Sequence, residues 1–389
     1  MPLQFGIDHL LQQSPHWKDK SIGFLTNHAA TTNTGIPSRK ALIDNGFNIV
    51  QLFSPEHGLD ATGTDGAKMK DGIDTLTGLK VISLYGEKFK PLKEDLSQID
   101  IMLFDIPDAG TRFYTYLWSM TYWIEAAAEN QIPVYILDRP NPLGGLMTQS
   151  EGPLLDEALS SFIGRFKIPI KHQCTLGELA LYFNKTQKWN ANIQVITCNS
   201  WKRDQLFYTW NLPWIKPSPA IQNMEACILY PGLCFFEATN ISVGRGTKYS
   251  FEWLGANWLN LSAITLVGQN LLSSEIKIEI LTLKIPSSIG IQETKGFRIK
   301  SLDPTNYSAV MNGLLLLKLL KDLHPQDFKW MPYPTQANPT GENHLSLLLG
   351  IPDAELIFDL PLQTWLQQIT KWLKISQWPQ EIKEFLLYS

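Results

Sequence analysis

The sequence has few cysteines and no long hydrophobic run. No C-x-x-C pair and no spacing typical of a metal site occurs among its four cysteines, which predicts reduced and mostly buried thiols. No uncharged apolar stretch reaches the roughly 20 residues that span a bilayer, so we expect no membrane span. The N-terminal residues also lack the apolar segment of a signal peptide, and from this we expect a cytoplasmic chain.

Charged residues are scarce as well, at 18% of the chain. The 33 Lys and Arg residues face 37 Asp and Glu residues, which gives a net charge of −4. Nonspecific binding to nucleic acid depends on an excess of basic residues, so we expect no nucleic-acid partner. In contrast, 44% of the 389 residues are hydrophobic and 13 are tryptophans, enough to build the cores of two domains. Many aromatic rings and few charges suit a cleft that binds a neutral or weakly charged ring.

The motifs of several common enzyme classes are missing. The first expected strand-to-helix turn, residues 26–35, contains no G-x-G-x-x-G, the glycine pair at 63–66 is too sparse to replace it, and no P-loop sequence occurs. We therefore expect no nucleotide cofactor. Neither H-E-x-x-H nor G-x-S-x-G is present. His28, His57 and His172 could meet at a metal ion, but isolated histidines are usually only hydrogen-bonded, so we predict no metal.

Short apolar runs alternate with helical segments in the first half of the chain. This alternation predicts βαβ units and therefore an α/β fold with a Rossmann-like, mostly parallel sheet. The runs expected to form strands are residues 22–26, 49–53, 81–84, 101–104, 134–137 and 193–197. The segments expected to form helices are residues 38–45, 117–129 and 175–183.

The pattern changes after a proline-rich crossing segment at residues 211–223. A glycine-punctuated loop is expected at 230–247, followed by a strand at 276–283 and a helix at 307–323. We therefore predict a Rossmann-like N-terminal domain over residues 1–225, a smaller α+β domain over residues 226–389, and a cleft between them.

Polar and ionisable residues follow each of the first five expected strands. In a parallel sheet, ligands bind beyond the carboxyl ends of the strands, so these residues are expected to meet at one edge. They are Asn27 and His28; Glu56 and His57; Tyr85; Asp105, Asp108, Arg112 and Tyr114; and Asp138. Such convergence favours an enzyme site over an ordinary surface.

Glu56 is the first candidate for a catalytic group. It lies on a short turn between Pro55 and Gly58, where Phe53 would partly shield it, so a raised pKa and a role as general acid are expected. The alternative is a solvated carboxylate on a turn. Tyr85 is a second candidate, as a hydrogen-bond donor or as a ring that stacks on a sugar.

Several other candidates have structural alternatives. Arg112 could bind a substrate carboxylate through two hydrogen bonds, or it could form an ion pair with Asp108. Asp105 could contact a ligand, cap a helix or anchor a loop. Arg245, between two glycines, could point at a ligand, and Glu252 could face Glu56 across the cleft or merely pair with Arg245.

Several long motifs of this sequence resemble those of the peptidoglycan exo-β-N-acetylmuramidase (NamZ-type) family. The motifs are SPEHGL, DIPDAGTRFYTY, DRPNPLGG, EGPLLDEALSSFIGRFKIPIKH and FFEATNISVGRGT, and the resemblance as a whole runs from about Gly6 to the C-terminus. The resemblance implies a glycoside hydrolase that releases N-acetylmuramic acid from the non-reducing ends of cell-wall glycan fragments. It also implies two domains with the active cleft between them, and export from the cytoplasm, in contrast to the expectation from the N-terminus.

The resemblance also assigns roles to particular positions. Glu56 of the PEHG turn corresponds to the favoured acid/base residue. The residues that correspond to positions lining the family's cleft are Tyr85, Asp105, Arg112, Tyr114 and Arg245. We accordingly predict Glu56 and Tyr85 as catalytic residues. The residues predicted to bind substrate are Asn27, His28, His57, Asp105, Asp108, Arg112, Tyr114, Arg245 and Glu252.

The predicted partner is a small carbohydrate, a muropeptide or a glycan that ends in muramic acid. Its lactyl carboxylate would be recognised by Arg112 or Arg245, and cleavage would need an acid and support for an oxocarbenium-like charge. A non-catalytic sugar-binding protein and a hydrolase of another bond, such as an amidase or esterase, remain alternatives.

Overall fold

The first half of the chain folds around a seven-stranded sheet. The structure is a computed structural model that describes residues 2–271, 276–287 and 290–389. The strands are ordered β3-β4-β2-β1-β5-β6-β9, and every neighbouring pair is parallel except β3 with β4. Their bounds are β1 Ile22–Thr26, β2 Ile49–Ser54, β3 Gly72–Ile73, β4 Lys80–Ser83, β5 Ile101–Asp105, β6 Val134–Leu137 and β9 Ile193–Ile196. The six expected strands and the mostly parallel, Rossmann-like sheet are confirmed.

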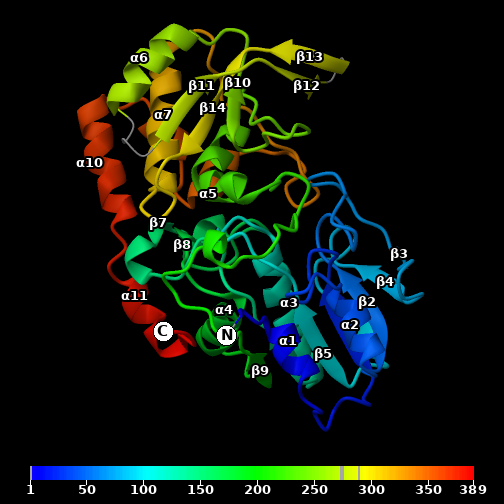
Figure 1. The fold of residues 1–389 in the computed structure, drawn as a ribbon. Coiled ribbons are helices and arrows are strands. Elements are labelled where there is room, and N and C mark those ends of the chain that lie inside the picture. The colour runs from blue at the N-terminus through cyan, green and yellow to red at the C-terminus, as the bar shows by residue number, and fades with distance from the viewer. Residues whose placement is uncertain (1, 272–275, 288–289) are drawn as a thin grey trace.

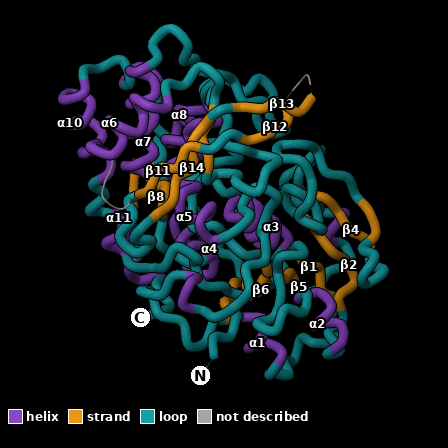
Figure 2. The backbone as a smooth tube through the Cα atoms, turned by 45° about the horizontal axis from the view of Figure 1, so that its top comes forward, coloured by secondary structure: helices purple, strands orange, loops and turns teal. Residues whose placement is uncertain are grey.

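Helices cover both faces of this sheet, because its strands are apolar on both sides. On β1, Phe24 packs into one hydrophobic cluster and Leu25 into the other, as the two-residue period of a strand requires. Figure 2 shows the central strands running side by side between the helices. The cluster around Phe24 includes residues of α1 (Gly6–Leu11) and α2 (Ser38–Asp44), and the cluster around Leu25 includes residues of α3 (Tyr116–Asn130) and α4 (Leu176–Thr186).

The second half combines small antiparallel sheets with helices, and these sheets lie at the top of Figure 1. Its three-stranded sheet has the order β10-β14-β11, and β12 pairs with β13 in a hairpin. The strand bounds are β10 Trp253–Gly255, β11 Ile276–Ile280, β12 Leu283–Ser287, β13 Gly290–Thr294 and β14 Gly296–Ser301. The helices are α5 Met224–Leu233, α6 Leu261–Leu271, α7 Ala309–Leu323, α8 His344–Leu349, α9 Ala354–Ile357, α10 Leu362–Leu373 and α11 Trp378–Glu381. Among the described residues, no helix has both the length and the apolar character needed to cross a membrane.

The expected loop at residues 230–247 is wrong in its first part. Helix α5 continues through Pro231 and Gly232, and a 3-10 helix follows at Cys234–Ala238. Gly232 is needed for packing here, since a side-chain carbon on it would lie 2.1 Å from the carbonyl oxygen of Ala309 at the start of α7. The sequence therefore uses this glycine for a close approach between two helices, not to end a helix.

The end of the chain returns to the first half. Trp378 Nε1 donates a hydrogen bond to the carbonyl oxygen of His172, and the Tyr388 hydroxyl donates to Asp138, next to α4. The hairpin of β7 (Glu151–Leu154) and β8 (Pro169–Lys171) packs against α10 at the same boundary. The two halves therefore share extensive contacts, and the division near residue 225 stays a prediction.

Candidate active site

Glu56 lies on a tight turn directly after β2. The turn is closed by a hydrogen bond from Gly58 N to the carbonyl oxygen of Pro55, and His57 adopts a left-handed backbone with φ of 65°. This conformation is uncommon for a residue with a side chain and is often found where function requires it. It directs Glu56 inward, so that only 5% of the residue is exposed.

The Glu56 carboxyl group accepts two hydrogen bonds. Gly66 N donates to Oε1 over 2.9 Å and Thr115 Oγ1 donates to Oε2 over 2.7 Å. Burial nevertheless raises the pKa of Glu56, and the charge of Asp65 raises it further. Glu56 therefore keeps its proton at a higher pH than an ordinary glutamic acid, as a general acid must.

Asp65 faces Glu56 from the same loop and has the opposite pKa shift. Its Oδ2 accepts a 2.6 Å hydrogen bond from the Tyr333 hydroxyl, and its Oδ1 lies 3.2 Å from Arg245 Nη2. Burial by itself would raise the pKa of Asp65, but Arg245 and the other donors lower it below its usual value. Asp65 is therefore the ionised carboxylate of the pair.

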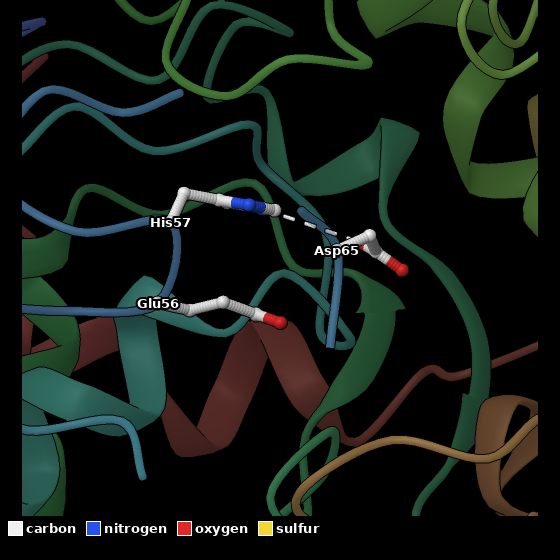
Figure 3. Close-up of side chains that lie close together, drawn as sticks. All are labelled: Glu56, His57 and Asp65. Carbon is white, nitrogen blue, oxygen red and sulfur yellow. Dashed lines mark ion pairs between the residues drawn. The ribbon is translucent and has the colours of Figure 1, made fainter. Parts of the chain in front are cut away.

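His57 completes the cluster drawn in Figure 3, where the dashed line joins it to Asp65. Its Nδ1 lies 2.8 Å from the carbonyl oxygen of Gly63, so Nδ1 carries a proton and donates it. Its Nε2 lies 3.9 Å from Asp65 Oδ1. The carboxyl groups of Glu56 and Asp65 extend in the same direction in this view.

Residues of the second half complete the pocket. Arg245 pairs through Nε with Glu237, and burial raises the pKa of Glu237. His344 stacks on the Tyr333 ring, and burial lowers its pKa to about 4, so His344 is neutral near neutral pH. The described polar and aromatic residues that line this pocket are Glu56, His57, Asp65, Tyr85, Phe113, Tyr114, Thr115, Ser218, Tyr230, Glu237, Arg245, Phe251, Tyr333, Thr335 and His344. The cleft between the two halves is thus confirmed.

Comparison with known proteins identifies the family of this chain. The N-terminal model of the exo-β-N-acetylmuramidase NamZ family matches residues 22–225, and its C-terminal model matches residues 228–388. The chain belongs to the NamZ family. It is 39% identical over 333 residues to a peptidoglycan β-N-acetylmuramidase NamZ of Bacillus subtilis, covering 85% of this chain and 80% of that protein.

Two solved structures share the NamZ-family fold. Both are DUF1343 family proteins from Bacteroides fragilis, and each comparison covers 100% of this chain and 99% of the other. The first is 27% identical with a TM-score of 0.86, and the second is 28% identical with a TM-score of 0.71. These likenesses cover both halves of the chain.

Five of the predicted site residues line the pocket together. They are Glu56, His57, Tyr85, Tyr114 and Arg245. Burial and the nearby Glu56 carboxyl group raise the pKa of Tyr85, so this side chain is a neutral phenol that can donate a hydrogen bond but does not act as a base. The roles assigned to these residues in the NamZ family stay predictions.

Arg112 does not line the pocket, and the prediction that it reads a substrate carboxylate is wrong for this structure. Its side chain is fully buried, and its guanidinium donates to the carbonyl oxygens of Pro153, Ile168 and Leu348. These bonds join the β7–β8 hairpin to α8. The expected alternative of a pair with Asp108 is replaced by these main-chain contacts.

Asp105 and Glu252 are also occupied away from the pocket. Asp105 is fully buried and forms an ion pair with Arg139, which corresponds to the alternative of an anchor. Glu252 is fully buried and pairs with Arg298 instead of Arg245. Because both carboxylates are covered, direct contact with a substrate is not available to them.

Asn27, His28 and Asp108 lie outside the pocket lining as well. Asn27 Oδ1 accepts a hydrogen bond from Ala29 N, which shapes the turn after β1. His28 is exposed and does not line this pocket, so its predicted contact with substrate stays a prediction. Asp108 accepts a bond from Gly110 N and lies 3.2 Å from His172, so the three histidines considered for a metal do not gather.

Three other side chains in the pocket lie close enough together to be considered as metal ligands. One ligand atom from each of Glu56, His57 and Asp65 lies within 4.8 Å of the others. However, Thr115 and Gly66 already donate to Glu56, and the cationic Arg245 lies beside Asp65. A neighbouring guanidinium opposes a second cation, so this donor set fits acid–base chemistry better than a metal.

Asp65, Tyr333 and His344 were missed by sequence reasoning. Asp65 lies between two glycines on the loop after β2, and this position beyond a parallel strand was the signal that could have found it. Tyr333 and His344 reach the pocket from a segment without a recognisable motif. Only the packing of the second half against the sheet brings them there.

Proposed function

We propose that this chain hydrolyses the β-glycosidic bond of a terminal N-acetylmuramic acid and so releases that sugar from the non-reducing ends of peptidoglycan fragments. Membership of the NamZ family and the likeness to the Bacillus subtilis muramidase support this activity. Peptidoglycan fragments are accordingly the expected substrate.

The proposed mechanism depends on Glu56, a buried carboxyl group with a raised pKa that lines a pocket formed by both halves of the chain. Cleavage of a glycosidic bond needs a proton for the leaving oxygen while positive charge develops on the sugar ring. Glu56 holds that proton, and the ionised Asp65 nearby stabilises positive charge. Glu56 is therefore assigned as the general acid, and as the base that later activates water.

The pocket also offers a partner for the lactyl carboxylate of muramic acid. Arg245 lines the pocket, and 28% of its side chain is exposed despite its pairs with Glu237 and Asp65. Burial raises the pKa of Glu237. As the pH falls, Glu237 therefore takes up a proton early and loses the negative charge that would compete with a substrate carboxylate for Arg245. Arg245, and not Arg112, is proposed to recognise the lactyl group.

Mass spectrometry of the products tests the activity. A disaccharide with N-acetylmuramic acid at its non-reducing end should yield the two monosaccharides with the wild-type chain. A sugar-binding protein without activity would leave the disaccharide intact over hours. An amidase acting on a muropeptide would release peptide and leave the glycan uncut. Either result would reject the proposal.

A further inference from the structure

The distance between Glu56 and Asp65 bears on the stereochemistry of the proposed hydrolysis. One carboxylate oxygen of Glu56 and one of Asp65 lie within 4.8 Å of each other. Inverting glycosidases separate their two carboxyl groups by about 6.5–9.5 Å to leave room for a water molecule, whereas retaining enzymes separate them by about 5 Å. This spacing lies below the inverting range and matches a retaining pair.

We propose that Asp65 is the catalytic nucleophile and that hydrolysis retains the configuration at the anomeric carbon. This inference rests on the proposed glycosidase function and adds the second catalytic group. It assigns to Asp65 a position beside the anomeric carbon, on the face opposite the departing oxygen.

The surroundings of Asp65 suit an anionic nucleophile. The Tyr333 hydroxyl and Arg245 each hold one oxygen of its carboxylate, which fixes the group and stabilises its negative charge. The same contacts lower the pKa of Asp65, which makes it a better leaving group when the glycosyl ester is later cleaved. About a quarter of the side chain, 26%, is exposed, so a bound sugar can reach it.

Glu237 is the other carboxyl group near enough to be considered. Its side chain is only 5% exposed, and it is covered by Arg245. Burial also raises the pKa of Glu237, which favours the neutral form that cannot attack. Glu237 therefore serves to orient Arg245, and Asp65 is the anionic carboxylate that a bound sugar can contact.

The two steps balance without a cofactor. In the first, a carboxylate oxygen of Asp65 bonds to the anomeric carbon while the glycosidic bond breaks, and the Glu56 proton passes to the leaving oxygen. In the second, water attacks the same carbon, the bond to Asp65 breaks, and Glu56 accepts a proton from the water. The products are free N-acetylmuramic acid and the shortened glycan.

Proton NMR of the first product formed tests the stereochemistry. With wild-type protein and 4-nitrophenyl β-N-acetylmuraminide, the β anomer should appear first and convert to the α anomer only by slow mutarotation. Initial release of the α anomer would overturn the inference while leaving the glycosidase activity itself established. Absence of any hydrolysis would instead reject the proposed function.

Azide distinguishes attack by Asp65 from attack by the substrate's own acetamido group. Without the Asp65 carboxylate, we expect Asp65→Ala to be at least about 100-fold less active than wild type. Azide can enter the vacated face of this variant, so an α-glycosyl azide is the expected product. Asp60→Asn, an exposed change on the same loop, should keep wild-type activity. A β-glycosyl azide from Asp65→Ala, or hydrolysis at more than one tenth of the wild-type rate, would overturn the assignment.

A second measurement does not depend on the folding of a variant. A 2-deoxy-2-fluoro muraminide with a good leaving group lacks the acetamido group, and it should inactivate the wild-type protein with time. Peptide mapping should place the sugar on Asp65. A label on another residue, or turnover without any accumulation of labelled protein, would count against Asp65.

Discussion

Glu56 and Asp65 lie on one loop and line one pocket, with one carboxylate oxygen of each within 4.8 Å of the other, and their pKa values are shifted in opposite directions. Burial and the negative charge of Asp65 raise the pKa of Glu56, while Arg245 lowers that of Asp65. Such a split assigns one carboxyl group as the proton donor and the other as the permanent anion. The proposed chemistry follows from this pair.

The pH dependence of activity should follow the protonation of Glu56. Because its pKa is raised, the acid form persists to higher pH than for an ordinary glutamic acid and is lost as the pH rises through that value. Thr115 donates to the charged form and so lowers the pKa of Glu56. In Thr115→Val the basic limb of the kcat/KM profile should therefore move to higher pH.

Initial rates across a pH series for wild type and Thr115→Val measure this shift. Thr62→Val, an exposed threonine on the same loop, should leave the profile unchanged. A basic limb that moves to lower pH, or does not move, would argue that another group controls it.

Chelators should have no effect on hydrolysis. Glu56, His57 and Asp65 are close enough to hold a metal, but Thr115 already donates to Glu56 and Arg245 already pairs with Asp65. Activity after dialysis against EDTA should match that of untreated protein. A loss that added zinc or another divalent cation restores would support a metal hydrolase instead.

Arg112 should contribute to stability and not to substrate recognition. Its guanidinium donates to three buried carbonyl groups, and Arg112→Met would leave them without partners. We expect the free energy of unfolding to fall by at least about 2 kcal/mol, as measured by denaturant titration. The affinity of the folded variant for N-acetylmuramic acid should stay within twofold of wild type, and a large selective loss of affinity would restore the carboxylate-reading role.

Arg245 should distinguish N-acetylmuramic acid from N-acetylglucosamine, which lacks the lactyl carboxylate. Calorimetry should show that wild-type protein binds the first sugar more tightly, and that Arg245→Gln brings the two dissociation constants close together. If the ratio of the two dissociation constants is unchanged in this variant, Arg245 does not recognise the lactyl group.

Much of the fold could be predicted because the strands carry apolar runs separated by helical segments. The rule that ligands bind beyond the carboxyl ends of parallel strands also placed Glu56, Tyr85 and Tyr114 correctly in the pocket. The same rule failed for Asp105 and Arg112. It identifies an edge of the sheet but not which side chains at that edge are covered by later parts of the chain.

The part of the site that could not be predicted from the sequence depends on contacts between residues far apart in the chain. Arg112 is covered because the carbonyl group of Leu348 in α8 reaches it, and Asp65 is ionised because Tyr333 and Arg245 reach it. No short sequence motif around these residues predicts such contacts. The pKa of Asp65 is therefore a property of the assembled chain.

The role of Glu56 is tested most directly by the dependence of its Gln variant on the leaving group. A sugar alcohol needs a proton to depart, whereas 2,4-dinitrophenolate does not. Glu56→Gln should lower kcat/KM at least about 100-fold on the disaccharide but much less on 2,4-dinitrophenyl β-N-acetylmuraminide. Glu87→Gln, at an exposed site, should match wild type on both substrates. Equal losses on both substrates, or no loss on the disaccharide, would contradict the assignment of Glu56 as the proton donor.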